Sequence, residues 1–116
     1  FNTLTELKKI KVKMFVSSAT PTSTLKRIIS MRGWNELFDG ITGSPDSKED
    51  HLRSILFSNN YSLSEVAYIG DSEVDQKAAL LIGCKFIGIG KNWIRFDSRP
   101  VVLLDTLEKL IKELKL

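Results

Sequence analysis

The sequence has 116 residues, which is enough for one modest domain around a single hydrophobic core and too few for two. Apolar residues make up 42% and charged residues 27%, and the net charge of +3 comes from lysines and arginines spread along the chain. This dispersed charge excludes the basic stripe that nucleic-acid binding requires. No apolar run approaches the roughly 20 residues that span a bilayer, so we expect neither nucleic acid nor a membrane as a partner.

The single cysteine, Cys84, lies in the apolar run 80–89 and has no second thiol to pair with in this chain. A chain that forms no internal disulfide and buries its thiol is typical of a reducing compartment. We therefore expect a cytoplasmic protein in which Cys84 packs behind a sheet and does not act as a nucleophile.

Helical and strand-like patterns alternate along the chain. Apolar residues recur at helical spacing, between capping residues and helix breakers, over residues 4–10, 21–32, 47–57 and 72–82. Short apolar runs predict strands over residues 12–16, 38–42, 66–69, 86–89 and 101–103. Pro21 suits the first position of the second helix, and Asp105 is expected to cap a last amphipathic helix.

The strands lack a regular alternation of apolar and polar residues and are separated by helices. This arrangement indicates a parallel sheet covered on both faces, and therefore an α/β fold over the single domain 1–116. Ligands bind to such sheets beyond the carboxyl ends of the strands, so polar residues that follow a strand are the candidates for chemistry.

The most informative segment joins the strand 66–69 to the next helix. Gly70 permits a sharp turn, and Asp71 and Asp75 follow at a spacing of four residues. Carboxylates at a strand end and in the next helical turn can converge on one hard cation, and Mg²⁺ favours a few protein oxygens completed by water and phosphate. The plainer interpretation is that Ser72 caps the helix and Asp75 completes a capping box, although a cap explains neither Gly70 nor Asp71.

Two further segments place polar residues near expected strand ends. Ser17 and Ser18 follow the first strand, where a hydroxyl and the N–H groups of the next helix would hold a phosphate oxygen. Lys48 lies near a helix start, where a cation is unfavourable unless an anion such as phosphate is close. The plainer interpretations are a helix cap for the serines and a solvated surface lysine. His51, the only histidine, is expected to be exposed or to pack against a helix without a catalytic role.

Taken together, these features resemble the second, third and fourth motifs of the haloacid dehalogenase-like superfamily, and most of all its phosphoglycolate phosphatase and β-phosphoglucomutase-like members. The resemblance covers nearly the whole chain and implies a three-layer α/β/α Rossmann-like core with a parallel sheet. It also implies that Ser17 and Ser18 bind the phosphoryl group, and that Lys48 is a catalytic residue holding both that group and the nucleophile. Asp71 would bind Mg²⁺ directly, and Asp75 would bind it or orient its waters.

Two departures from the pattern of this family stand out. Many relatives have Lys-Pro-x-Pro where this sequence has Lys48-Glu-Asp-His51. The first motif, a strand ending in Asp-x-Asp that supplies the nucleophile and the general acid/base, has no counterpart here. Asp39-Gly-Ile-Thr resembles part of it but follows a helix end and lies downstream of the second motif.

In this family the first-motif strand lies in the middle of the sheet, between the strands that correspond to residues 12–16 and 66–69. We therefore expect an incomplete core, a fragment that lacks this strand and the cap domain. The sheet would be completed by a missing N-terminal segment or by another chain.

The resemblance implies a Mg²⁺-dependent phosphatase that acts on a small phosphorylated metabolite through an aspartyl-phosphate. Without the nucleophile, this chain alone is expected to be inactive. Two alternatives stay open at this point: a phosphosugar mutase, and a non-catalytic regulatory domain that kept the fold and lost the first motif.

Overall fold

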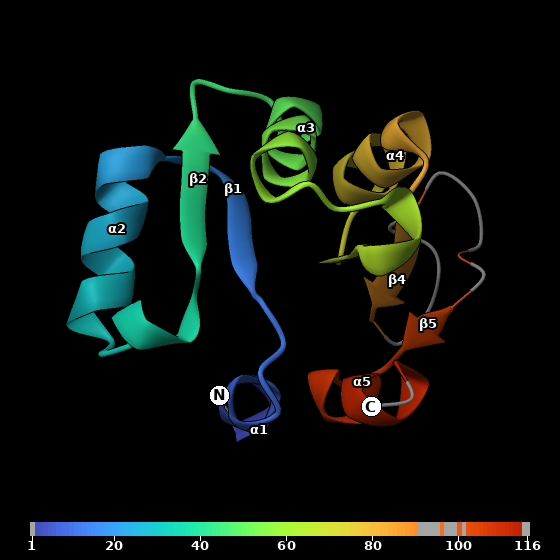
Figure 1. Ribbon diagram of the computed structural model, residues 1–116, viewed down its shortest axis with the longest axis horizontal. Helices are drawn as coiled ribbons and strands as arrows, with labels where there is room; N and C mark the ends of the chain where they lie inside the picture. The colour runs from blue at the N-terminus through green and yellow to red at the C-terminus, as the bar shows by residue number, and fades with distance from the viewer. Residues whose placement is uncertain (1, 91–95, 97–99, 101, 115–116) are drawn as a thin grey trace. The chain divides into compact units, whose positions relative to one another are not determined.

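The computed structural model describes residues 2–90, 96, 100 and 102–114, along which helices and strands alternate (Figure 1). The helices in these ranges are α1 (Asn2–Lys9), α2 (Thr22–Met31), α3 (Lys48–Asn59), α4 (Glu73–Ile82) and α5 (Leu110–Glu113). The strands are β1 (Phe15–Pro21), β2 (Gly40–Ser44), β3 (Ala67–Gly70), β4 (Lys85–Ile89) and β5 (Leu103–Leu104). No helix within the described ranges has both the length and the apolar character needed to cross a membrane.

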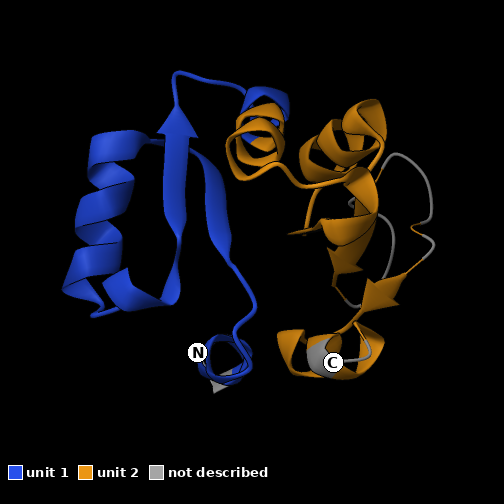
Figure 2. Cartoon of the chain, viewed as in Figure 1, with its two compact units in different colours: residues 1–51 blue, residues 52–116 orange. Residues whose placement is uncertain are grey.

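The chain divides into two compact units, residues 1–51 and residues 52–116 (Figure 2). β1 pairs with β2 in the first unit, and the second unit holds a sheet with the order β3–β4–β5. Each of these pairings is parallel. The predicted α/β class with parallel strands is therefore confirmed, whereas the assignment of residues 1–116 to one domain stays a prediction.

In the first unit, α2 packs along the β1–β2 pair (Figure 1). Leu25 and Ile29 lie four residues apart on one face of α2, and both are buried. This spacing of apolar residues brings one helix face onto the strands and explains why the segment is helical. On the strands, Ser17 lies opposite Thr42, and the register shifts between Ser17 and Pro21.

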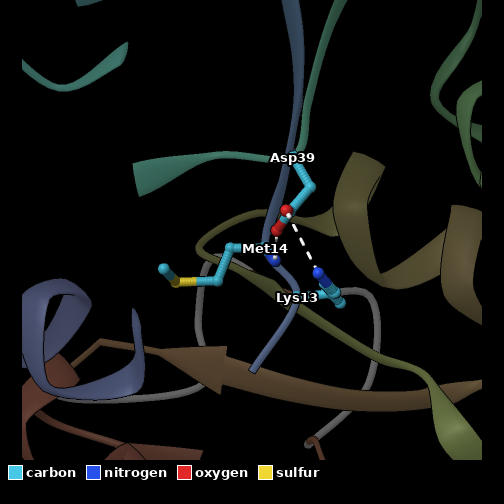
Figure 3. Close-up of polar contacts among 3 residues, drawn as sticks. All are labelled: Lys13, Met14 and Asp39. Carbon is cyan, nitrogen blue, oxygen red and sulfur yellow. Dashed lines mark hydrogen bonds and ion pairs between the residues drawn. The ribbon is translucent and has the colours of Figure 1, made fainter. Parts of the chain in front are cut away.

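Asp39 hydrogen-bonds to Met14 and so connects the residue before β1 with the segment that leads into β2 (Figure 3). Its Oδ2 accepts a hydrogen bond from the Met14 N–H at 2.8 Å, and its own N–H donates to the Met14 carbonyl at 2.6 Å. The Lys13 ammonium lies 3.8 Å from Oδ1 and forms an ion pair. These bonds extend the strand pairing by one residue beyond Phe15 and Gly40, so Asp39 has a structural role.

The second unit has its own core, formed where α4 covers β3 and β4 (Figure 1). The buried members of this core are Leu52, Tyr68, Ala78, Ala79 and Cys84, and Val66, Ile82 and Phe86 pack against them. α4 ends at Gly83, whose φ of 94° lies in the left-handed region that glycine adopts without strain. The expected helix end at residue 82 is therefore confirmed.

The expected first strand is displaced towards the C-terminus. β1 begins at Phe15, so Ser17 and Ser18 lie within the strand and not after it. The reason is a turn at the end of α1, where Lys11 adopts a left-handed φ of 65° and the chain needs several residues before it becomes extended. Pro21 is the last strand residue and the N-cap of α2, and not the first helical residue.

The end of the chain also differs from expectation. Asp105 does not cap the last helix, because Thr106 is the N-cap of a 3₁₀ turn that precedes α5. Asp105 instead pairs with the Lys109 ammonium at 2.8 Å, and this contact lowers the pKa of the carboxyl. The expected strand 101–103 is found as β5, and residue 101 lies outside the described residues.

Across the described ranges, β1 pairs only with β2, and β3 pairs only with β4. The first-motif strand is expected between β1 and β3. The finding that these two strands belong to separate sheets agrees with an incomplete core. The origin of the completing strand, whether a missing segment or another chain, stays a prediction.

We expect Asp39→Ala to lower the free energy of unfolding by about 1–2 kcal/mol, because the Met14 N–H loses its acceptor. Lys13→Ala should change it by less than about 0.5 kcal/mol, because the Lys13 side chain is 65% exposed and its ion pair is weak. Urea unfolding of the two variants measures both values. Equal losses would show that the ion pair, and not the backbone hydrogen bond, holds the strand start.

Candidate functional site

The candidate residues are distributed over both units. Ser17, Ser18 and Lys48 lie in the first unit, and Asp71 and Asp75 lie in the second.

The end of the β1–β2 pair is fixed by tight packing around Gly43. A Cβ at this position would overlap the Thr20 carbonyl oxygen and lie 2.9 Å from the Thr22 nitrogen, so only glycine fits. The Gly43 N–H donates to the Thr22 hydroxyl at 3.0 Å, and that hydroxyl donates to the Ser44 carbonyl at 3.3 Å. One threonine side chain therefore ties the start of α2 to β2.

The two serines lie next to this fixed end and make different contacts. The Ser18 hydroxyl accepts a hydrogen bond from the Thr20 N–H at 3.1 Å, which stabilises the irregular end of β1. The Ser17 hydroxyl lies 2.7 Å from Nδ1 of His51, on a different element. Ser17 therefore takes part in a side-chain network, while the bond between Ser18 and Thr20 lies within β1.

Lys48 is the first residue of α3 and is partly buried. The helix start is capped by Ser47, whose hydroxyl accepts a hydrogen bond from the Asp50 N–H at 3.2 Å. His51 lies one turn further along, on the same face as Lys48, since residues three apart are neighbours on a helix. The bond between His51 and Ser17 thus brings β1 to the first turn of α3, the turn that carries Lys48.

His51 is the member of this group that sequence reasoning missed. It is 2% exposed, so of the two expected positions, exposed to solvent or packed against a helix, the first is wrong. Its Nε2 lies 2.9 Å from the Gly43 carbonyl oxygen and its Nδ1 faces Ser17, so the ring bridges β2 and β1. The available signal was the departure Lys48-Glu-Asp-His51, which places a polar ring where many relatives have proline.

The acidic residues of the second unit lie at the turn between β3 and α4. Asp75 is 7% exposed, and its carboxylate accepts hydrogen bonds from three neighbouring groups among the described residues. The Tyr68 hydroxyl donates to Oδ1 at 3.2 Å, while the Asp71 N–H and the Ser72 hydroxyl each donate to Oδ2 at 3.2 Å. The bond from its N–H holds the Asp71 backbone in place, and the Asp71 residue is exposed at the strand end.

The expected capping box between Ser72 and Asp75 is wrong. Ser72 is the N-cap of α4, but its side chain makes no capping hydrogen bond. The Asp75 carboxylate reaches back to the Asp71 N–H instead of the Ser72 N–H. Gly70 makes room for this arrangement, since a Cβ there would overlap the Cβ, Cγ and Oδ2 of Asp75.

The donor set of this turn fits one part of a Mg²⁺ site. Within the described part of the chain, no group of three or more His, Cys, Asp or Glu side chains is arranged to hold a metal. Mg²⁺ is usually bound by only one or two carboxylates, with water and phosphate as the other ligands. The exposed Asp71 suits direct coordination. Asp75 suits an outer role, because both of its oxygens already accept hydrogen bonds from the protein.

Cys84 lies in the core of the second unit, as expected from its apolar surroundings. Burial raises the pKa of its thiol, which lowers the fraction of reactive thiolate at neutral pH. The thiol is therefore a core group and a poor nucleophile.

The family of the chain follows from its match to known sequences. A family model described as haloacid dehalogenase-like hydrolase matches residues 1–89. This chain belongs to the haloacid dehalogenase-like hydrolases. A search of the curated proteins gave no match.

Solved structures of haloacid dehalogenase-like hydrolases share the fold of this chain. A protein from Bacteroides fragilis, assigned to the same hydrolase family, is 28% identical with a TM-score of 0.83; the match covers 96% of this chain and 57% of that one. A predicted phosphatase from Clostridium acetobutylicum is 25% identical with a TM-score of 0.85, over 99% and 58% of the two chains. A protein from Lactobacillus delbrueckii subsp. bulgaricus, assigned as a phosphoglycolate phosphatase, is 23% identical with a TM-score of 0.81, over 97% and 50%. The chain thus spans 50–58% of the length of these three relatives.

We expect Gly70→Ala to lower the free energy of unfolding by about 1–3 kcal/mol, because the new methyl group displaces the Asp75 side chain. Gly40→Ala is the matched control, since a Cβ there meets only the Phe15 ring, at 2.9 and 3.3 Å, and this ring can shift. Urea unfolding compares the two variants. A Gly70→Ala chain as stable as the control would show that Asp75 does not pack tightly against this turn.

Proposed function

We propose that this chain is part of a Mg²⁺-dependent phosphatase that hydrolyses a small phosphorylated metabolite. The observation that carries the proposal is the acidic turn after β3, where buried Asp75 fixes the backbone of exposed Asp71. A strand end with one held and one exposed carboxylate fits an oxygen-binding divalent cation. The assignments of its structural relatives from Clostridium acetobutylicum and Lactobacillus delbrueckii as phosphatases support the same reaction class.

In this proposal Asp71 binds Mg²⁺ and Asp75 positions Asp71. Tyr68 and Ser72 hold the Asp75 carboxylate in turn, and so fix the direction in which the turn presents its oxygens. The cation would neutralise negative charge on the phosphoryl group and on the attacking carboxylate.

The first unit supplies the groups that bind the phosphoryl oxygens. Lys48 provides a positive charge at the start of α3, and the Ser17 hydroxyl provides a hydrogen bond from a fixed strand end. Ser18 is proposed as a further contact. These groups act by stabilising charge on the transferring phosphoryl group, which is the main contribution that a protein makes to this reaction.

The nucleophile in this proposal is an aspartate supplied from outside the present sequence. It would attack phosphorus, accept the phosphoryl group as an aspartyl-phosphate and release the alcohol, and water would then hydrolyse the acyl phosphate. The 116-residue chain by itself should therefore bind ligands of the site without turnover. A cytoplasmic location is part of the same proposal.

The first test is Mg²⁺ binding to the chain, measured by calorimetry and amide chemical shifts. We expect saturable binding that Asp71→Ala abolishes and that Asp75→Asn weakens by about 10–100-fold. Glu73→Gln is the matched control: this side chain lies in the same turn but is half exposed and pairs with Lys77, so binding should be unchanged. Equal weakening by Glu73→Gln would indicate a diffuse ion atmosphere in place of a defined site.

The second test is hydrolysis of a panel of phosphate esters by the full-length gene product. Lys48→Met should lower kcat by roughly 10²–10³-fold, because one charged group that stabilises the transferring phosphoryl is lost. Lys77→Met, which removes an exposed lysine from α4, should leave kcat unchanged. A full-length protein that binds Mg²⁺ but hydrolyses no ester would favour the regulatory alternative.

A further inference from the structure

His51 forms a closed hydrogen-bond bridge that determines where its protons lie. Its Nε2 faces the Gly43 carbonyl oxygen at 2.9 Å, and a carbonyl oxygen can only accept. Nε2 must therefore carry a hydrogen. In the neutral ring Nδ1 then has none, so at 2.7 Å it accepts the hydrogen of the Ser17 hydroxyl.

This arrangement conflicts with a phosphate-binding role for Ser17. A hydroxyl has one hydrogen, and in the neutral bridge that hydrogen is directed to His51. A fully ionised phosphate or sulfate oxygen carries no hydrogen and can only accept. Ser17 therefore cannot donate to such an anion while it donates to the neutral imidazole.

Protonation of His51 removes the conflict. In the imidazolium form both ring nitrogens carry hydrogens, so Nε2 still donates to Gly43 and Nδ1 donates to the Ser17 oxygen. The Ser17 hydrogen is then released for the anion. One proton is taken up from solvent and forms an N–H bond at Nδ1, and no bond between heavy atoms forms or breaks.

We propose that His51 takes up a proton when an anion binds at Ser17, and so switches the Ser17 hydroxyl from His51 to the anion. His51 is in this sense a positioning residue, since it acts through Ser17. The inference rests on the proposed phosphate-binding role of Ser17 and adds a pH dependence to it.

The surroundings of the ring are compatible with this switch. The two strands that His51 bonds to, β1 and β2, contribute no charged side chain. The charged residues near it on its own helix are Lys48 one turn earlier, Glu49 and Asp50 in the two preceding positions, and Arg53 two residues later. An anion held by Ser17 would be separated from the imidazole by a single hydroxyl, and its charge would favour the imidazolium.

Sulfate is a suitable probe, because it keeps its charge and carries no proton in the range from about pH 5 to 8, where an imidazole changes its charge. Binding consumes a proton, so sulfate affinity should be highest at low pH and fall by up to about tenfold per pH unit as the pH rises. His51→Gln should bind sulfate with an affinity independent of pH, since its amide has no charge to gain. Ser17→Ala should bind more weakly and with a much flatter pH dependence.

A direct measurement on the unmodified chain avoids any dependence on the folding of these variants. His51 is the only histidine, so the imidazole ¹⁵N signals belong to it alone. At a pH where the ring of the free chain is neutral, they should show hydrogen on Nε2 and none on Nδ1. Addition of sulfate at the same pH should convert them to the doubly protonated form.

The outcomes separate this inference from the proposed function. Sulfate binding that does not change with pH, or a ring that stays neutral when sulfate is bound, overturns the switch and leaves the phosphate site standing. A pH dependence that survives unchanged in His51→Gln also overturns the switch. An absence of sulfate binding at every pH, with Mg²⁺ still bound by Asp71, overturns the phosphate-binding role of Ser17 and the switch with it.

Discussion

The burial of a single imidazole ring fixes much of the first unit. His51 is almost completely removed from water, so both of its nitrogens need partners within the protein. They find them on two neighbouring strands, at Ser17 and Gly43, and this bridge anchors the first turn of α3. Without the bridge, the direction of α3 as it leaves β2 would depend on a short polar connection that begins at Pro45. The position of Lys48 follows from the same constraint, because it lies one turn before the ring.

The second unit uses a buried polar side chain in a comparable way. Asp75 lies in the first turn of α4, as His51 lies in the first turn of α3, and each reaches back to the strand end that precedes its helix. Gly70 provides the space for Asp75, since a Cβ there would overlap the Asp75 side chain, whereas Gly43 makes room for the backbone at Thr20 and Thr22. Buried polar groups are costly unless their hydrogen bonds are complete. Once they are complete, they hold a strand-to-helix turn in one geometry, which suits a site that binds charged ligands.

Features formed by residues close together in the sequence could be predicted, whereas features formed by residues far apart in the sequence could not. The turn with Asp71 and Asp75 could be predicted because strand, glycine, carboxylates and helix are contiguous in the chain. The bridge between Ser17 and His51 spans 34 residues and depends on the register of two strands, so no local pattern contains it. The position of Ser17 within β1 was missed for a related reason, since the turn at Lys11 delays the start of the strand.

The location of Cys84 has a consequence for following the motions of this protein. It is the only cysteine in the chain, it is buried in the core of the second unit, and the first unit has none. A thiol reagent therefore reacts with this protein at a rate set by transient opening of the second unit, while openings confined to the first unit leave no covalent trace. The chain thus carries a built-in probe for the cooperativity of its two halves: agreement between thiol exchange and amide hydrogen exchange in residues 1–51 would mean that both halves open together.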